Sequence, residues 1–251
     1  MMEKLAPYRV FTSSSLKLIA VITMLIDHFG ATVMSQAILK LPAVKADADL
    51  YHNMLILYRL IRYIGRVAFP IYCFLLVEGA VHTHDMKKYI LRMGIFALIS
   101  EVPFDLAFYH RLVYTEHQNV FFTLGLGLLA IWFLEHPIEH LDIPDVLYKL
   151  LVIIVAGLIA EFFNTDYGFT GIAVICVFYY LREQPQLKYP IAAILLAAMG
   201  GVEVYAVLAL IPILLSNGRR GRQTKVMQYG FYIFYPAHLL LLAVLYHLFV
   251  L

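Results

Sequence analysis

Residues 16–38 read LKLIAVITMLIDHFGATVMSQAI, and this stretch decides the fold. It is long and apolar enough to cross the hydrocarbon core of a bilayer as one helix. Near its middle it holds Asp27 and His28. A charged Asp at that depth costs about 2.5–3.5 kcal/mol on insertion scales, so a span keeps such groups when they are paired, hydrated or used. We interpret the pair as functional rather than as a histidine that only packs against a neighbouring helix.

Lys17 lies on the same predicted helix, eleven residues before His28. At 100° per residue this spacing is three turns plus about 20°, so both side chains share one face, roughly 16 Å apart along the axis. A cation near the membrane surface is thereby aligned with a titratable imidazole deep in the span. This geometry suits a reaction that crosses part of a bilayer.

The composition of the chain is that of a polytopic membrane protein. Of its 251 residues, 62% are hydrophobic and 14% are charged, whereas soluble domains carry about 25% charged residues. The longest polar stretch, 40–53, is only a loop, so we predict one integral-membrane domain over residues 1–251. The net charge of +2 gives no indication of nucleic-acid binding.

Neither cysteines nor histidines predict a metal site. Cys73 and Cys176 both lie in apolar runs and are typical of small buried hydrophobic residues. Two pairs of histidines are close in sequence, but neither pair has a third ligand nearby. We therefore expect no metal.

Nine spans, with an uncertainty of about one, follow from the apolar runs. They are 16–38, 55–81, 87–109, 119–135, 146–163, 168–182, 188–202, 204–216 and 229–250. The Gly200–Gly201 pair makes 188–216 either one kinked helix or two re-entrant halves. Lys and Arg concentrate on the inner side when the N-terminus is cytoplasmic, and the outer side keeps only Lys40, Lys45 and Arg111.

The second and third spans carry further charged residues. Three arginines, Arg59, Arg62 and Arg66, recur at i, i+3 and i+7 on one face. Glu101 and Asp105 lie at i and i+4 in the third span, where they repel each other unless one is protonated or an arginine lies between them. The arginines are their natural partners. Ion pairing between helices and a functional role both remain open for these residues, with Arg62 and Arg66 favouring function.

Two other segments offer candidates. In the basic stretch 82–92, Lys88 and Arg92 are spaced at i and i+4 and can clamp a phosphate, although such charge is also ordinary on the cytoplasmic side. Asn119, at the start of the fourth span, either caps that helix or lines a cavity. The last span places His238 two residues after Pro236, inside the membrane.

Several of these stretches together resemble the TraX family. The matching motifs are Leu16–Ala20 with Met24–His28, Gly65–Pro70, Phe74–Gly79, Ser100–Asp105, Gln118–Leu124 and Phe234–Leu239. They come in family order over nearly the whole chain. The family is named for a conjugation protein that acetylates the N-terminus of pilin with acetyl-coenzyme A.

The TraX family is similar to the wider transmembrane acyltransferases, whose first span has Arg or Lys, ten residues, then His. Lys17 and His28 match this spacing. The segment ending in Glu78 is similar to a Phe-Phe-x-Leu-Ser-Gly-Phe motif, with Glu in place of Ser. The acyltransferases also have an Arg-x-x-Arg motif. At the corresponding positions this chain has Tyr89 and Arg92, so the first arginine of the pattern is absent, and Lys88 lies one residue before Tyr89.

The resemblance implies an all-α bundle of about nine (8–10) transmembrane helices around a central acyl-transfer cavity, in the cell membrane. Acetyl-coenzyme A is the expected donor, and the acceptor is a peptide amine or a lipid or glycan hydroxyl. A pantetheine arm of roughly 15–20 Å is comparable to the rise between Lys17 and His28.

Roles for individual residues follow from this expectation. The predicted catalytic residues are His28 as general base, Asp27 and Arg66. The predicted donor contacts are Lys17, Lys88, Arg92 and Tyr89. The predicted substrate contacts are Arg62, Glu78, Glu101, Asp105, Asn119, Tyr235 and His238.

Two other classes of protein stay open. A proton-coupled transporter or channel would use Asp27, His28, Glu101 and Asp105 as a relay. An assembly factor without chemistry would leave the charged residues inside the spans without a reason.

Overall fold

The computed structural model describes residues 7–138, 140–141, 143–222 and 224–250, and within these it is helical with no strand. Isolated bridges join Phe11 to Ser216 and Gln118 to Thr165. The prediction of an all-α protein is therefore confirmed. The helices belong to two compact units, and the chain passes between them repeatedly, so neither unit is one continuous segment.

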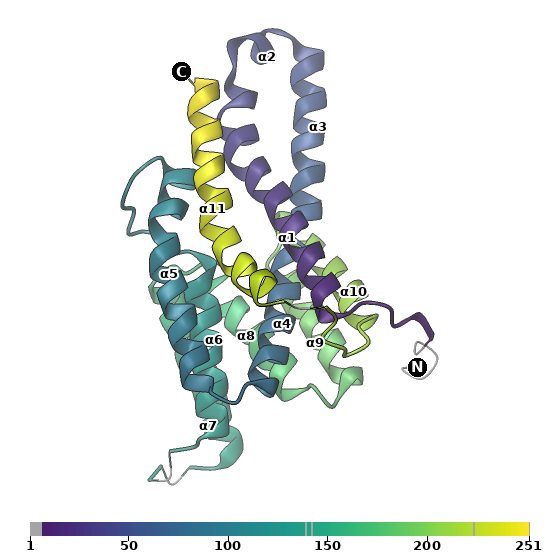
Figure 1. Ribbon diagram of the computed structural model, residues 1–251, viewed down its shortest axis with the longest axis vertical. Helices are drawn as coiled ribbons and strands as arrows, with labels where there is room; N and C mark the ends of the chain where they lie inside the picture. The colour runs from purple at the N-terminus through teal and green to yellow at the C-terminus, as the bar shows by residue number, and fades with distance from the viewer. Residues whose placement is uncertain (1–6, 139, 142, 223, 251) are drawn as a thin grey trace. The chain divides into compact units, whose positions relative to one another are not determined.

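The first unit contains the described parts of Met1–Ile71, Val102–Tyr114 and Gly200–Leu251. Its helices are α1 (Ser13–Phe29), the π-helix η2 (Gly30–Met34), the 3₁₀ helix η3 (Ile38–Lys40), α2 (Pro42–Ala46), α3 (Ala48–Gly65), the 3₁₀ helix η4 (Gly201–Ala209), α10 (Leu210–Leu214) and α11 (Lys225–Val250). Within it, α1 packs against both α3 and α11 (Figure 1).

Local sequence explains how α1 begins and how closely it approaches α3. The Thr12 hydroxyl accepts from Ser15 N while the Ser15 hydroxyl accepts from Thr12 N, a capping box. Gly30 faces Ile61 and Arg62 on α3, and a Cβ atom there would lie 3.0 Å from Ile61. The glycine therefore lets the two backbones come close together.

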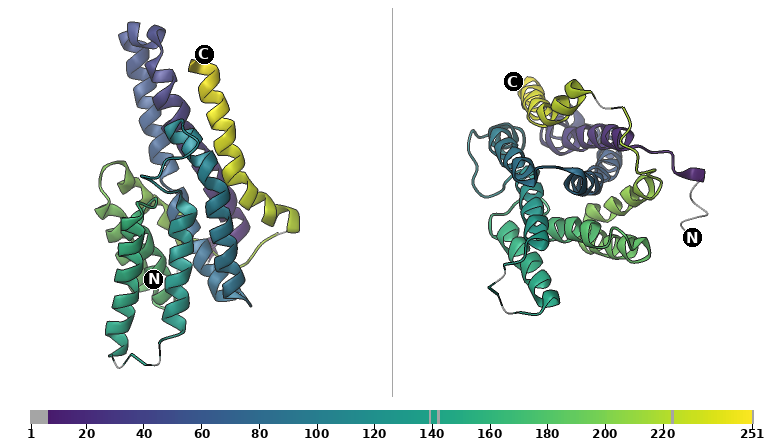
Figure 2. Two further views of the ribbon diagram at one scale, coloured as in Figure 1. Left: turned by 90° about the vertical axis from the view of Figure 1, so that its left-hand side faces the viewer. Right: turned by 60° about the horizontal axis from the view of Figure 1, so that its bottom comes forward.

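The second unit contains the described parts of Tyr72–Glu101 and Thr115–Met199. Its helices are most of α4 (Ala68–His82), the first part of α5 (Met86–Tyr109), α6 (Val120–Glu135), α7 (Asp145–Phe162), α8 (Gly168–Tyr180) and α9 (Pro185–Ala198). Each of α6, α7 and α8 packs against the other two, and α9 packs on α8 (Figure 2).

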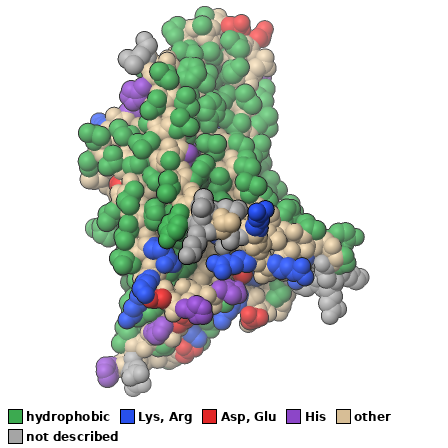
Figure 3. Space-filling view, viewed as in Figure 1, with side chains coloured by type: hydrophobic (Ala, Val, Ile, Leu, Met, Phe, Trp, Pro, Cys, Tyr) green, Lys and Arg blue, Asp and Glu red, His purple; other side chains and the backbone are tan. Residues whose placement is uncertain are grey.

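Long apolar helices make this a multi-pass membrane protein. Among the described residues, Ser13–Lys40, Ala48–His82 and Tyr229–Val250 are long and apolar enough to cross a membrane, and shorter apolar helices accompany them. Hydrophobic side chains cover most of the visible surface in the region of α11 (Figure 3). On this helix, Leu241 is 56% and Leu248 70% exposed. Such a surface suits lipid rather than water. The count of nine spans stays a prediction.

The predicted span over 55–81 falls within Ala48–His82, which is long and apolar enough to cross a membrane, but it consists of two helices. The helix α3 starts earlier, at Ala48, and ends at Gly65, and α4 starts at Ala68. The physical reason is Pro70, which has no N–H to donate to the Arg66 carbonyl and whose ring would crowd it. Pro70 is tolerated in the first turn of a new helix.

The stretch 188–216 is also two elements. The helix α9 ends at Ala198, and Gly200 and Gly201 have φ angles of +72° and +53°, which favour glycine. The segment after them is the 3₁₀ helix η4 followed by α10. The chain therefore forms two separate helical elements here and not one kinked helix.

Candidate functional site

The carboxylate of Asp27 lies between Arg62 of α3 and Arg66, the residue directly after that helix. Arg62 Nη1 is 3.0 Å from Asp27 Oδ1, and Arg66 Nη2 pairs with Asp27 Oδ2. Asp27 and Arg66 are both buried. Gly65 makes this approach possible, because a Cβ atom there would overlap the Asp27 side chain. Asp27 thus contacts the neighbouring helix α3. The side chains of Asp27 and His28 are about 100° apart around the axis of α1, so the two residues face different neighbours.

Arg66 uses the other branch of its guanidinium for Glu203. Its Nη1 is 2.5 Å from Glu203 Oε1, at the start of η4. Two positive and two negative groups therefore form one network with no net charge, joining α1, α3 and η4. Tyr63 and Tyr205 stack beside it, with ring centroids 3.9 Å apart. A planar fork that binds two carboxylates is a property of arginine that lysine lacks.

His28 forms a hydrogen-bonded pair with His238 of α11. Nδ1 of His28 lies 2.7 Å from Nε2 of His238. The two ring planes are within 12° and their centroids are 5.0 Å apart. This is the arrangement expected when an in-plane N–H of one ring points at the lone pair of the other. The structure therefore unites two histidines that the sequence placed in the first and last spans.

The tautomers of both rings follow from a backbone contact. His238 Nδ1 is 2.7 Å from the Phe234 carbonyl oxygen, which can only accept, so Nδ1 donates. In a neutral ring Nε2 is then an acceptor, and His28 Nδ1 must donate to it. The unprotonated nitrogen of His28 is consequently Nε2, which makes no hydrogen bond to the residues that the structure describes.

Aromatic rings surround this pair. Phe108 and Tyr235 meet the His28 ring edge to face, at centroid distances of 5.4 and 6.0 Å. Directly after His28 the chain enters the π-helix η2, and the Thr32 hydroxyl donates to the His28 carbonyl. Short π-helical turns occur often at functional sites. Of the predicted site residues, Asp27, His28, Arg62, Arg66, Tyr235 and His238 come together here.

Lys17 and Asp105 belong to the same unit. Lys17 lies with His28 on the continuous helix α1, as predicted, and its ammonium is 5.5 Å from the centroid of Phe231. Asp105 is buried, and its Oδ2 accepts from Tyr114 N at 2.7 Å. The expected partnership of Arg62 and Arg66 with Asp105 is not seen within the first unit. There Arg62 pairs with Asp27, and Arg66 pairs with Asp27 and Glu203. Arg59 is exposed.

The other predicted residues lie in the second unit. Lys88 pairs with Asp85 at 3.0 Å, which holds the pKa of the Asp85 carboxyl below its ordinary value through hydrogen bonds from Lys88. Arg92 lies over the Tyr89 ring, 5.4 Å from its centroid. Tyr89 in turn packs against Gly79. Lys88 and Arg92 are both exposed, and both act electrostatically on the Asp85 carboxylate.

Glu101 and Asn119 bind each other. The Asn119 amide donates to Glu101 and to the Ala97 carbonyl, and its oxygen accepts from Phe121 N at 3.0 Å. Asn119 therefore caps α6, which decides between the two alternatives for this residue. Glu78 is half-buried in α4, and its carbonyl oxygen is 2.8 Å from His82 Nδ1.

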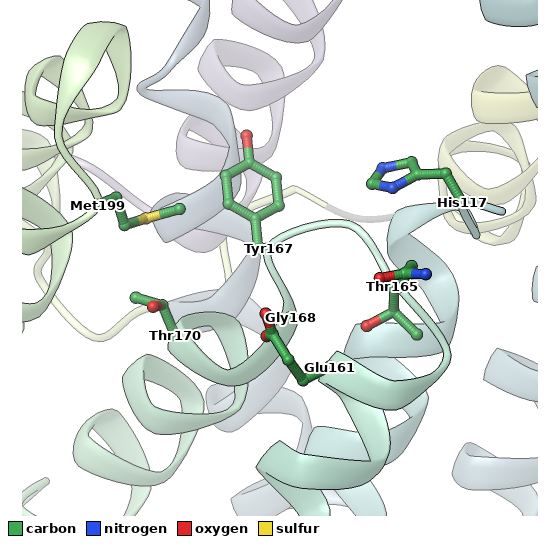
Figure 4. Close-up of a pocket in the computed structure, with 8 residues that line it drawn as sticks. His117, Glu161, Thr165, Tyr167, Gly168, Thr170 and Met199 are labelled. Carbon is green, nitrogen blue, oxygen red and sulfur yellow. The ribbon is translucent and has the colours of Figure 1, made fainter.

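A polar pocket of about 320 Å³ lies within the second unit (Figure 4). His117, Glu161, Thr165 and Tyr167 contribute to its lining. Next to it, His117 Nε2 is 3.9 Å from Asp166 Oδ1, and this carboxylate raises the pKa of His117 above its ordinary value. The sequence analysis did not identify this pocket, because its residues come from separate segments.

Glu203 is the main site residue that the sequence analysis missed. The sequence does contain a feature that could have identified it. Glu203 is an acidic residue in the apolar stretch 202–215, two residues after the Gly200–Gly201 pair. A group of three or more His, Cys, Asp or Glu side chains suited to a metal is absent from the described residues.

Known proteins resemble this chain along nearly all of its length. The family model described as TraX protein matches residues 12–246. A protein of Dichelobacter nodosus, named as probable fimbrial assembly protein FimC of serogroup H1, is 27% identical over 258 residues, covering 92% of this chain and 94% of that protein. No solved structure matches significantly.

Proposed function

This chain belongs to the TraX protein family, and we propose that it is an integral-membrane acyltransferase. It moves an acetyl or short acyl group from cytoplasmic acyl-coenzyme A to an amine or hydroxyl acceptor. The observation that carries the proposal is the orientation of His28. Its Nδ1 donates a hydrogen bond to His238. The basic Nε2 is therefore the nitrogen that can take a proton from a reactant.

His28 acts as the general base in this proposal. Nε2 takes a proton from the neutral acceptor amine or hydroxyl as that atom attacks the thioester carbonyl. The new carbon–nitrogen or carbon–oxygen bond forms, the carbon–sulfur bond breaks, and the departing thiolate takes the proton from His28. The hydrogen bond to His238 Nε2 stabilises the transient imidazolium, because His28 Nδ1 then donates as a charged group.

The arginines have different roles. Arg66 is held between Asp27 and Glu203 and fixes the position of α3 against α1 and η4. Arg62 makes one ion pair and one weaker contact, to the Asp27 carbonyl at 3.4 Å, both through Nη1. Its other N–H groups make no hydrogen bond to the residues that the structure describes and can donate to a developing oxyanion, so Arg62 rather than Arg66 is the electrostatic stabiliser.

Direct transfer is favoured over an acyl-enzyme. Within the described residues the His28 ring hydrogen-bonds to His238 alone, so no serine hydroxyl or cysteine thiol is bonded to it. A histidine base without a neighbouring hydroxyl or thiol nucleophile suits attack by the acceptor itself.

The transporter alternative has weaker support. A proton relay needs a carboxylate that changes its protonation state, whereas each oxygen of Asp27 faces a guanidinium group that favours the charged form. Asp105 binds the Tyr114 backbone rather than the histidine pair.

A pilin-type peptide amine is the first acceptor to test. The Dichelobacter nodosus relative is named as a probable fimbrial assembly protein, and the family resemblance points to the pilin N-terminus. An N-terminal amine also meets the chemical requirement of the mechanism, since its neutral form is a good nucleophile near neutral pH.

The test uses purified protein, labelled acetyl-coenzyme A and acceptors with a free or a blocked N-terminus. His28→Ala should abolish transfer while the protein still inserts and purifies. His52→Ala, an exposed histidine of α3, is the matched control and should keep full activity. Near-wild-type transfer by His28→Ala would overturn the mechanism. Proton uptake into vesicles without any acyl transfer would instead favour the transporter.

A further inference from the structure

We propose that segment 216–222, folded onto the start of α1, is the binding site for the phosphate groups of the acyl donor. This inference rests on the proposed function and gives the donor a location. It assigns the donor phosphates to Arg219, Arg220 and Arg222 in place of Lys88 and Arg92 of the basic stretch 82–92, and it keeps Lys17.

Backbone hydrogen bonds attach the segment to α1. Ser13 N donates to the Arg219 carbonyl at 3.0 Å, and Ser14 N donates to the Arg220 carbonyl at 3.2 Å. The Ser14 hydroxyl lies 2.8 Å from the Arg222 carbonyl. The first N–H groups of the helix are thus capped by carbonyls of the arginines themselves, which fixes where these residues lie.

Two glycines shape this connection. Gly218 and Gly221 have φ angles of +69° and +74°, in the left-handed region. A Cβ atom on Gly221 would lie 2.6 Å from Thr12 Oγ1 and 3.0 Å from Ser14 Oγ. The segment therefore fits against the helix only with glycine at this position, and the fit places two adjacent arginines between the glycines.

The charge at this point is unfavourable without an anion. Like charges that lie close together repel each other, and an anion among them relieves the repulsion. Arg219, Arg220 and Arg222 are exposed at the start of α1, and Arg220 acts electrostatically on Lys17. Within the described residues, Arg219 and Arg222 form no ion pair with a carboxylate. Lys and Arg side chains gather on this part of the surface (Figure 3).

An organic phosphate bound here would be in reach of His28. Along the continuous helix α1, His28 lies about 16 Å from Lys17 and about 21 Å from Ser14, to which the segment is hydrogen-bonded. A span of this order suits a donor with phosphates at one end and a thioester at the end of a long flexible arm. The phosphate of an anionic lipid headgroup has the same chemistry, so the experiment must separate the two sources.

The experiment measures coenzyme A binding to the whole protein in nanodiscs of phosphatidylcholine alone. The variant Arg219→Gln/Arg222→Gln should bind coenzyme A at least roughly tenfold more weakly, because charge-assisted hydrogen bonds to phosphate are lost. The control Lys40→Gln/Lys45→Gln removes the same charge from η3 and α2 and should bind normally. Gly221→Ala should also weaken binding, since it displaces the segment without changing charge.

The outcomes separate this inference from the proposed function. Unchanged affinity in the arginine variant would overturn the site, even if the wild type transfers acyl groups. Binding of phosphatidylglycerol that depends on the arginines, with no binding of coenzyme A, would assign the site to lipid and overturn the donor assignment. If His28→Ala binds coenzyme A normally but transfers nothing, both the site and the mechanism are supported. Wild-type protein that binds coenzyme A through the arginines yet transfers to no acceptor would refute the proposed function alone.

Discussion

The side chain of Asp27 lies against the backbone of Gly65, at a place where any Cβ atom would overlap it. This contact allows the carboxylate to reach both Arg62 and Arg66. The position of the ion-pair network, and with it the orientation of α1, therefore depends on the absence of a side chain at Gly65.

Gly65→Ala should lower the free energy of unfolding by about 1–3 kcal/mol, as expected for overpacking a buried contact. Thermal unfolding in detergent measures the effect. Gly94→Ala is the control, because a Cβ atom there meets nothing within 4 Å and alanine favours the helix α5. Equal melting temperatures for both variants would mean that α1 and α3 approach each other less closely than the Asp27–Gly65 contact requires.

His238→Gln should keep more activity than His238→Ala. A glutamine oxygen can accept from His28 Nδ1 and preserve the tautomer with a basic Nε2, whereas alanine leaves Nδ1 without its partner. We expect turnover to fall roughly 100-fold in His238→Ala, within the range of general acid–base catalysis. The pH dependence of turnover is the decisive readout, because a residue that only packs would lower activity without shifting the profile. Equal rates in both variants would show that His238 does not orient His28.

Arg66→Leu should destabilise the protein by about 3–5 kcal/mol, because it leaves the buried Asp27 and the half-buried Glu203 without their shared partner. Arg66→Lys should recover only part of this, since an ammonium cannot bridge two carboxylates as a planar fork does. Arg59→Leu, at an exposed position of the same helix, is the control. Melting temperatures and turnover measured on all three variants test the assignment, and a stable, active Arg66→Leu protein would contradict it.

His117 should make stability depend on pH. Asp166 raises the pKa of His117 in the folded protein above its unfolded value. The ion pair therefore stabilises the fold fully below the unfolded pKa, and this contribution is lost as pH rises through the folded pKa. His117→Gln should flatten the corresponding part of a plot of melting temperature against pH. An identical plot for wild type and variant would show that the pair contributes nothing.

Much of the site could be predicted from residues that are close in sequence. A helix fixes the spacing of its own side chains, so an interval of eleven residues was enough to put Lys17 and His28 on one face, and the continuous helix α1 agrees with this. Pro70 likewise contained the signal for the break between α3 and α4, although the prediction of one span over 55–81 overlooked it. The polar residues of the spans were recognisable because charge is rare and costly inside a bilayer.

The partners of those residues could not be predicted. His28 and His238 are 210 positions apart, and Arg66 and Glu203 are 137 apart. The periodicity of one helix says which face a side chain occupies but not which other helix lies opposite. For this reason the arginines were expected to bind carboxylates of the third span, whereas packing through Gly65 brings them to Asp27.

The sequence by itself determined that the chain is helical, that it lies in a membrane, and that Asp27 and His28 occupy an unusual place in a span, because each of these follows from local composition and spacing. The tertiary structure decided which nitrogen of His28 is basic and which carboxylates hold Arg66. Both depend on contacts between elements distant in sequence, made only when the helices pack together.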